Sequence, residues 1–227
     1  MKTRYISWDE ALGYKKDELE YAAGVLREGG LVAFPTETVY GLGGNGLMKE
    51  ASVKIYEAKG RPSDNPLILH ISSRQELEPI VRGITPEAEA LMEAFWPGPM
   101  TLIFQKAPEV PLETTGGLET VAVRMPSHAG ARELIRQAGV PVAAPSANTS
   151  GRPSPTRAEH VKEDLDGKID VIIDGGQVGI GIESTIIDLT EDVPVILRPG
   201  YITKARAVGR RGPYGSGTVR KGPIEAS

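Results

Sequence analysis

The stretch EASVKIYEAKGRPSDNPLILHIS, residues 50–72, contains the unit on which the fold prediction rests. Its apolar spacing predicts a helix over residues 50–59, and Gly60 stands where helices commonly end in a left-handed glycine. The apolar run at residues 67–72 then predicts a strand. This helix-to-strand succession is typical of an α/β sheet.

The rest of the chain extends the succession in both directions. Periodicity and capping signals predict further helices at residues 15–28 and 128–138, after Ser73, at Thr85-Pro86 and after Thr156. Strands are predicted at residues 31–34, 100–105, 120–124, 140–144, 169–173, 184–189 and 193–197, and loops at residues 35–46 and 145–156. Because the strand pairs within 100–124 and 184–197 have no helix between them, we predict an α/β fold whose sheet mixes parallel and antiparallel strands.

The composition excludes several classes of protein. With 227 residues and 40% hydrophobic content, the chain is long enough for one sizeable core. A net charge of −4 gives no overall electrostatic argument for nucleic-acid binding. The absence of cysteine removes disulfides, thiolate nucleophiles and cysteine-ligated zinc. The three histidines form no metal motif, so we expect no metal held directly by side chains.

The two ends of the chain carry further expectations. The N-terminus lacks the apolar core of a signal peptide, and no apolar run approaches the roughly 18 residues of a membrane span, so we expect a soluble cytoplasmic protein with no membrane partner. We expect one domain over residues 1–203. Residues 204–227 are expected to be a basic, glycine-rich tail or the start of an interdomain linker, because residues 200–221 carry six cations and no acid.

The turn after the helix at 50–59 is a candidate anion site. Arg61 and Asn65 each precede a proline, which biases both toward extended backbone. In an extended segment Lys59 and Arg61 point to the same side, and a lysine beside an arginine suits a polyphosphate. The alternative is an ordinary helix C-terminus, where cations favour the helix dipole. The residues alone leave both interpretations open.

Two polar loops are also candidates. The loop at 35–44 follows an apolar strand, as ligand-binding loops of open α/β sheets do, and the loop at 145–155 supplies hydroxyl and amide groups that hydrogen-bond phosphate or ribose. Neither loop fits the common glycine-rich phosphate motifs, and both are compatible with simple turns. Arg124 and Arg198 each end an apolar strand and are either surface termini or anion clamps. Ser184 at a strand start is either a ligand group or a strand-cap hydroxyl, and His70 within an apolar strand is more often a packed residue than a base.

Six motifs together resemble the YrdC-type threonylcarbamoyl-AMP synthase family. They follow the family's order over about residues 18–203 and read FPTETVYGLGG, KGRPSDNPLILHI, AVRMP, APSANTSGRPSPT, IESTIIDL and ILRPG. The resemblance implies a twisted, mixed α/β sheet with flanking helices around a large basic cavity. It also implies that L-threonine, bicarbonate and ATP, with Mg²⁺, are condensed to threonylcarbamoyl-AMP and pyrophosphate. A partner transferase would then modify a tRNA adenosine next to the anticodon, and tRNA itself is a further possible partner.

The resemblance also assigns roles to residues of this chain. Lys59 and Arg61 match the family's KxR motif and are the catalytic candidates. The implied threonine site consists of Thr38, His70, Arg124, Ser184 and the backbone at Ala144. The implied ATP site consists of Lys59, Arg61, Asn65, Thr120, Ser146, Asn148, Ser154 and Arg198.

Two alternative functions stand beside this one. A non-catalytic RNA-binding module is favoured by the six cations of residues 200–221, but aromatic residues are only 5% of the chain and offer no stacking platform. The related domain of hydrogenase-maturation carbamoyltransferases would require attached zinc fingers, which a chain without cysteine lacks. In length the chain fits neither the family's short form nor its long form, so two expectations stay open, a truncated long form or a short form with a basic extension.

Overall fold

The computed structural model describes residues 2–8, 15–204, 207 and 220–221. Residues 220 and 221 are described by their backbone alone. Its helices are α1 (Lys16–Arg27), α2 (Lys49–Lys59), α3 (Pro86–Phe95), α4 (Ala129–Ala138) and α5 (Ala158–Leu165), with short 3₁₀ turns η1 (Arg74–Glu76) and η2 (Glu78–Ile80). Its strands are β1 (Arg4–Ser7), β2 (Val32–Pro35), β3 (Tyr40–Asn45), β4 (Ile68–His70), β5 (Met100–Gln105), β6 (Thr120–Arg124), β7 (Val142–Ala143), β8 (Val171–Asp174), β9 (Thr185–Asp188), β10 (Val195–Arg198) and β11 (Arg220–Lys221). None of the helices in this described part is long and apolar enough to cross a membrane.

All these strands join in one sheet, in the order β1-β8-β2-β3-β7-β4-β6-β5-β9-β10-β11. Neighbours pair in parallel at β1–β8, β2–β8, β4–β6, β5–β9 and β10–β11. They pair antiparallel at β2–β3, β3–β7, β4–β7, β5–β6 and β9–β10. The prediction of a mixed α/β sheet is therefore confirmed.

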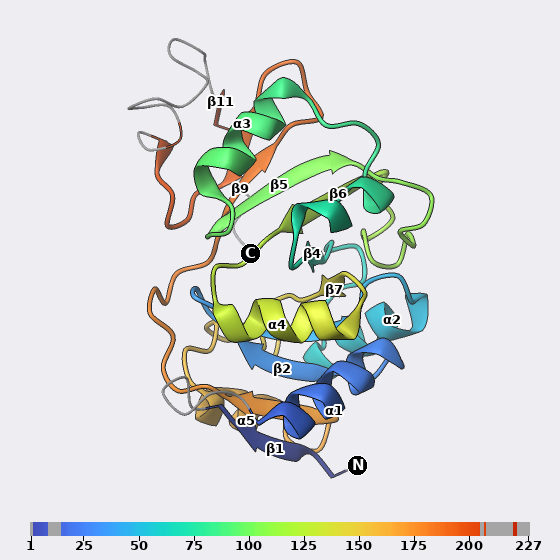
Figure 1. Cartoon of the computed structure of the whole chain (residues 1–227), viewed down its shortest axis with the longest axis vertical. Helices are drawn as coiled ribbons and strands as arrows, with labels where there is room; N and C mark the ends of the chain where they lie inside the picture. Colours follow the sequence, from blue (N-terminus) through green and yellow to red (C-terminus); the bar gives the residue numbers. More distant parts are fainter. Residues whose placement is uncertain (1, 9–14, 205–206, 208–219, 222–227) are drawn as a thin grey trace.

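β8 shows how helices cover the first half of the sheet. Val171 and Ile173 pack in one apolar cluster with α1 and α4, whereas Ile172 packs in the other cluster with Val161 and Leu165 of α5. Because successive side chains alternate across a strand, α1 and α4 cover one face of β8 and α5 covers the opposite face. Figure 1 shows α1 and α4 lying together against β2.

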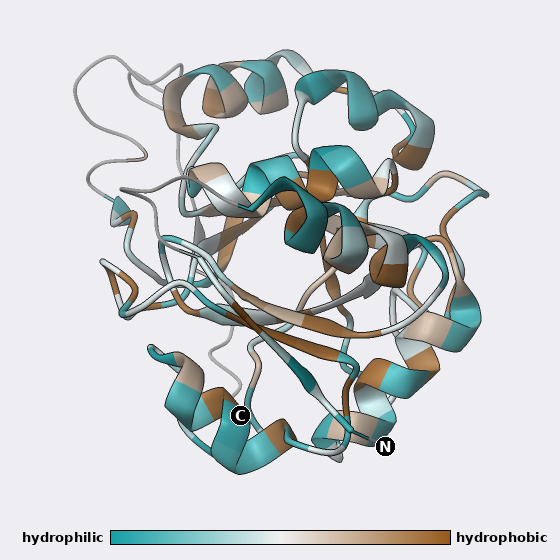
Figure 2. Ribbon diagram, turned by 60° about the horizontal axis from the view of Figure 1, so that its bottom comes forward, coloured by the Kyte–Doolittle hydropathy of each residue, from teal (hydrophilic) through white to brown (hydrophobic). Residues whose placement is uncertain are grey.

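The half of the sheet from β4 to β9 has one face covered by helix and one face turned to a cavity. Val121 and Val123 of β6 are buried with Leu91 and Met92 of α3, whereas Ala122 between them lines the cavity. In Figure 1 α3 lies across this half of the sheet, and Figure 2 shows apolar residues concentrated on the strands and on the inner faces of the helices. The free face of these strands becomes the floor of the candidate site.

Several local predictions are confirmed by backbone geometry. Gly60 ends α2 with φ 61° and Gly139 ends α4 with φ 69°, both in the left-handed region that favours glycine. Thr85 opens α3, and its hydroxyl accepts a hydrogen bond from the backbone N–H of Ala88 at 3.2 Å. These signals act within one turn of the chain, which is why the sequence reveals them.

Three local predictions are wrong. Residues 40–45 form the buried strand β3 rather than a loop, and a Cβ at Gly43 would lie 2.7 Å from the ring of Phe34, so glycine is needed there for close packing. Ser73 opens only the 3₁₀ turn η1, and its hydroxyl donates to the Glu76 carboxylate instead of capping the backbone. α5 begins after Arg157 with no side-chain cap, so the capping role assigned to Thr156 is not found.

Two edge strands were not predicted. β1 pairs with β8, and β11 pairs in parallel with β10. Most of the predicted tail, residues 205–206, 208–219 and 222–227, lies outside the described residues.

Candidate active site

A cavity of about 230 Å³ lies on the free face of the sheet. Three arginines and one glutamate contribute charge to its lining: Arg61, Arg124, Arg198 and Glu183. The lining therefore carries more positive than negative charge. The volume is below the roughly 300 to 1,000 Å³ of most ligand pockets, so the large basic cavity that the resemblance implies stays a prediction.

Strand register brings together one histidine and two arginines on the floor of the cavity. His70 of β4 pairs with Arg124 of β6, Arg124 pairs with Thr101 of β5, and Thr101 pairs with Ile186 of β9. Ile186 in turn pairs with Arg198 of β10. Residues paired across a sheet share one face, so this single row points one histidine and two arginines into the same space.

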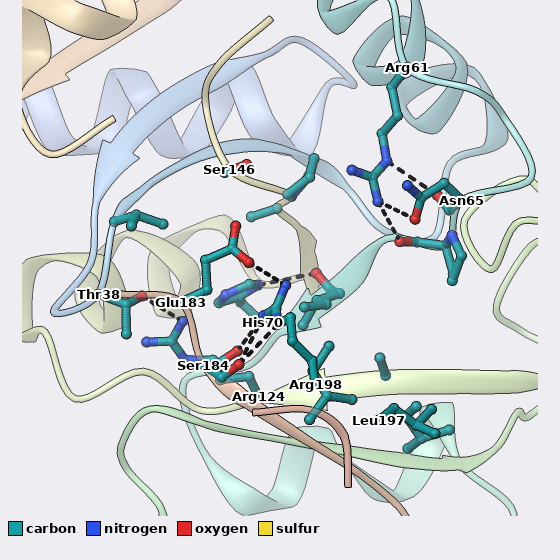
Figure 3. A pocket seen from close by; sticks show the side chains of 18 residues that line it. Thr38, Arg61, Asn65, His70, Arg124, Ser146, Glu183, Ser184, Leu197 and Arg198 are labelled. Atoms are coloured by element: carbon teal, nitrogen blue, oxygen red, sulfur yellow. Dashed lines mark hydrogen bonds and ion pairs between the residues drawn. The ribbon is translucent and has the colours of Figure 1, made fainter. Parts of the chain in front are cut away.

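Figure 3 shows Arg61 and Asn65 at one end of the cavity. The guanidinium of Arg61 donates to the side-chain oxygen of Asn65 at 2.6 Å and to the backbone oxygen of Pro66 at 3.2 Å. The backbone N–H of Arg61 donates to the backbone oxygen of Tyr56 at 3.0 Å, which completes the turn that ends α2. Arg61 and Asn65 contact each other, and both line the cavity.

Lys59 lies behind this end of the cavity instead of facing the same anion as Arg61. It is 1% exposed, and its ammonium donates to the backbone oxygens of Ser146 and Asn148. Burial lowers the pKa of Lys59 to about 7, and the nearby charge of Arg61 adds to this effect. The helix C-terminus is therefore not simply solvated, and Lys59 fixes the 146–148 loop beside the cavity.

Thr38 and Arg124 lie at the opposite end (Figure 3). Arg124 donates to the Thr38 hydroxyl at 2.9 Å, to the Glu37 carboxylate at 2.5 Å and to the backbone oxygen of Gly98 at 3.3 Å. Burial raises the pKa of Glu37, but the charge and hydrogen bond of Arg124 outweigh burial and lower it. Glu37 and Arg124 thus form a buried ion pair with a charged carboxylate.

Glu183, Ser184 and Arg198 lie between the two ends (Figure 3). Arg198 pairs with Glu183 at 2.6 Å and donates to the Ser184 hydroxyl at 3.1 Å. Glu183 also accepts a hydrogen bond from Ser154 at 2.9 Å. Ser154 therefore does not line the cavity itself but contacts a residue that does.

His70 is a neutral acceptor in this arrangement. Burial lowers its pKa to about 3, and the charge of Arg124 adds to the effect. Its Nδ1 lies 3.1 Å from the backbone oxygen of Ile68, which can only accept, so Nδ1 carries the hydrogen. Nε2 is then left with a lone pair.

The structure brings together nine of the residues that the resemblance assigned, all of which line the cavity: Thr38, Arg61, Asn65, His70, Arg124, Ala144, Ser146, Ser184 and Arg198. Four assigned residues do not line it. Lys59, Asn148 and Ser154 support its wall, and Thr120 lies on the face of β6 that carries Ala122 but beyond the lined region.

Glu37 and Glu183 were not singled out from the sequence. In both cases a glutamate directly precedes a hydroxyl residue, Thr38 or Ser184, and the pair contacts one arginine. The signal was the repeated Glu-Ser/Thr dipeptide, once in the predicted loop at 35–46 and once at the start of the predicted strand at 184–189. Nothing in the sequence identifies the arginine that each dipeptide meets.

The arrangement suits an anionic substrate with two charged ends. Arg124 and Arg198 already have carboxylate partners, whereas Arg61 has none among the described residues. Excess positive charge therefore lies at the Arg61 end, and the Arg124 end offers a guanidinium with a neutral acceptor beside it. Within the described residues, no group of three His, Asp or Glu side chains could hold a metal ion.

Comparison with known proteins gives a consistent result. The model of the Sua5/YciO/YrdC family, described as telomere recombination, matches residues 24–200. A threonylcarbamoyl-AMP synthase of Pyrococcus abyssi (strain GE5 / Orsay) is 61% identical over 183 residues, which are 81% of this chain and 54% of the relative. A threonylcarbamoyl-AMP synthase of Bacillus subtilis (strain 168) is 52% identical over 216 residues, which are 94% of this chain and 62% of the relative.

The solved structures agree with these sequence relatives. The crystal structure of P. abyssi Sua5 complexed with L-threonine superposes with a TM-score of 0.90 at 51% identity, over 98% of this chain and 63% of that chain. The chain thus spans only about half to three fifths of these relatives.

Proposed function

The chain belongs to the Sua5/YciO/YrdC family, and on that premise we propose that it condenses L-threonine, bicarbonate and ATP to threonylcarbamoyl-AMP and pyrophosphate. The observation that carries the proposal is the single cavity with a paired arginine, Arg124, at one end and an unpaired arginine, Arg61, at the other. An amino acid and a nucleotide need separate anion sites within reach of one another. A tRNA-modifying transferase would consume the product.

The Arg124 end supports the threonine part of the proposal. A guanidinium binds a carboxylate through two parallel hydrogen bonds, and Arg124 keeps N–H groups that none of its three partners uses. Neutral His70 and the Thr38 hydroxyl supply acceptors nearby for an amine or a hydroxyl. Carboxylate, amine and hydroxyl are the polar groups of threonine.

The Arg61 end supports the nucleotide part. Arg61 is partnered by Asn65 and backbone oxygens alone, so its charge is available to phosphates. Mg²⁺, when bound with ATP, would neutralise charge on the phosphates. Since Glu183 is already engaged by Arg198 and Ser154, we propose that phosphates and water hold the ion, with Glu183 as the nearest carboxylate.

The reaction then follows in two balanced steps. The amine of threonine adds to CO₂ derived from bicarbonate, which gives a carbamate and releases a proton. A carbamate oxygen attacks the α-phosphorus of ATP, and the bond to the bridging oxygen breaks as pyrophosphate leaves. The chain's contribution is to hold the reactants in line and to stabilise phosphate charge through Arg61 and Arg198, without a side-chain nucleophile.

One assay tests the proposal. The purified chain is incubated with ATP, Mg²⁺, bicarbonate and L-threonine, and pyrophosphate is measured with and without threonine. Threonine-dependent release supports the synthase, and an Arg61→Ala variant should abolish most of it. Threonine-independent release, or none, contradicts the proposal. RNA binding without turnover would instead support the alternative of an RNA-binding module, which no feature of the cavity favours.

A further inference from the structure

Thr36, Glu37 and Thr38 form a cradle in which Glu37 and Thr38 contact one guanidinium and Thr36 contacts Thr38. Glu37 accepts from one terminal nitrogen of Arg124 at 2.5 Å and Thr38 accepts from the other at 2.9 Å. The side chain of Arg124 is 5% exposed and that of Glu37 is 14% exposed, so water does not substitute for this pair. The orientation of Arg124 is thus set from behind the cavity.

Arg124 keeps two N–H groups that its partners within the chain do not use. A guanidinium carries five N–H groups. Three are used by the backbone oxygen of Gly98, the Thr38 hydroxyl and the Glu37 carboxylate. The two that remain lie one on each terminal nitrogen, so a ligand carboxylate can accept from both terminal nitrogens.

Hydrogen bonding also fixes the polarity of the Thr38 hydroxyl. The Thr36 hydroxyl lies 2.7 Å from the backbone oxygen of Val39, which can only accept, so Thr36 spends its one hydrogen there. The two threonine hydroxyls are 2.9 Å apart, and with the Thr36 hydrogen directed at Val39 we assign Thr38 as the donor between them. The Thr36 oxygen also accepts from the backbone N–H of Thr38 at 3.2 Å and of Val39 at 3.3 Å. Thr38 meanwhile accepts from Arg124.

The consequence is that Thr38 has no hydrogen left for a ligand. It offers the cavity a lone pair only. The Thr38 hydroxyl therefore selects a ligand group that donates, such as an amine or a hydroxyl. A carboxylate is excluded from that side and directed to Arg124.

The backbone of the cradle is held by a neighbouring loop. The backbone N–H of Ile180 donates to the backbone oxygen of Glu37 at 3.0 Å, and the backbone N–H of Gly181 donates to the backbone oxygen of Thr38 at 2.9 Å. This second loop leads to Glu183 and Ser184, which hold Arg198 in the same manner. Each arginine of the row thus has its own glutamate and hydroxyl.

We propose that Thr36 and Glu37 are positioning residues for the amino-acid substrate, Glu37 by orienting Arg124 and Thr36 by keeping Thr38 an acceptor. Neither residue lines the cavity. Together they define a site for a compound with a carboxylate and an adjacent donor, which is the chemistry of an α-amino acid. The inference rests on the proposed function for the identity of that amino acid.

The test separates amino-acid binding from nucleotide binding. Dissociation constants for L-threonine and for ATP are measured by titration on the full chain carrying Glu37→Gln, Thr36→Val or Thr36→Ser. We expect Glu37→Gln and Thr36→Val each to weaken threonine binding about tenfold while ATP binding changes less than about twofold, since the first removes the charge that orients Arg124 and the second removes the acceptor for the Thr38 hydroxyl. Thr36→Ser keeps the hydroxyl and should restore threonine binding.

The controls make each outcome decisive. Glu133→Gln removes a glutamate that pairs with Arg136 on the surface of α4 and should leave both affinities unchanged. Unchanged or tighter threonine binding in Glu37→Gln and Thr36→Val overturns the inference, as does an equal loss for both ligands. Because Glu37 belongs to a buried ion pair, the thermal unfolding of Glu37→Gln is measured before its affinities. If this variant does not fold, the comparison of Thr36→Val with Thr36→Ser decides whether the inference stands. A wild-type chain that fails to bind threonine would count against the proposed function itself.

Discussion

Arg198 of β10 pairs with Ile186 of β9, although the preceding pair is Ile196 with Ile187. β10 thus advances two residues where β9 advances one, which makes Leu197 a β-bulge. In an unbroken ladder Leu197 would have taken the place opposite Ile186, and Arg198 would face the other side of the sheet. The bulge therefore places Arg198 on the face of the sheet that lines the cavity.

A substitution at Gly200, which follows the bulge, provides a first prediction. A Cβ at Gly200 would lie 2.4 Å from the backbone oxygen of Glu183, so alanine must push the two segments apart. We expect Gly200→Ala to lower the free energy of unfolding by about 1–3 kcal/mol and to reduce pyrophosphate release more than it reduces folded protein. Urea unfolding and the synthase assay measure the two effects. Gly179→Ala, where a Cβ meets nothing within 4 Å, is the control. Equal behaviour of the two variants would contradict the prediction.

Lys59 provides a second prediction. Its ammonium holds the 146–148 loop through two backbone oxygens, so Lys59→Ala should leave those acceptors unpaired and the loop poorly fixed. We expect pyrophosphate release to fall about tenfold or more, together with faster amide exchange in the loop. Lys54→Ala removes an exposed lysine of the same helix that donates to a single backbone oxygen, and it should change neither quantity. Activity within a few-fold of wild type would remove Lys59 from the mechanism.

Arg61 provides a third prediction, which separates charge from shape. Arg61→Lys keeps the positive charge but loses the planar fork that contacts Asn65 and Pro66. We expect the KM for ATP to rise about tenfold, with the KM for threonine nearly unchanged, because the lost hydrogen bonds lie at one end of the cavity. Initial-rate kinetics with each substrate varied in turn measure this split. A rise in the threonine KM of the same size would contradict the assignment of Arg61 to the nucleotide end.

His70 provides a prediction about pH. Its pKa is about 3 in the folded chain and about 6.5 when unperturbed, so the unfolded chain binds more protons between these values. Stability therefore rises with pH across this window and is lost on acidification, with a contribution of up to about 1.4 kcal/mol per pH unit. Urea unfolding at a series of pH values should show a shallower acid loss for His70→Gln than for wild type. Parallel curves would show that His70 does not titrate in this way.

The sequence was informative where the cause was local. Gly60, Gly139 and Thr85 act within a single helical turn, and each does in the structure what its position predicted. β3 was missed because three of its six residues are glycine, which carries no apolar period. Its close packing depends on Phe34 of the preceding strand and on Val142, which lies far from Gly43 in the sequence.

The candidate site was partly predictable for a related reason. The order of the motifs identified the family and therefore nominated Thr38, Arg61 and Arg124, all of which line the cavity. The supporting roles of Lys59 and Glu37 were not predictable, because each depends on atoms brought close only by folding. Arg124 and Glu37, for example, are 87 residues apart in the chain.

By itself the sequence determined the helix ends, most of the strands and the family, since these depend on neighbouring residues or on the order of motifs. The tertiary structure alone decided that His70, Arg124 and Arg198 share one row, and that Thr38 can only accept a hydrogen bond. The physical reason is that strand register and hydrogen-bond polarity are set by long-range pairing. A shift of one residue, such as the bulge at Leu197, moves a side chain to the opposite face of the sheet.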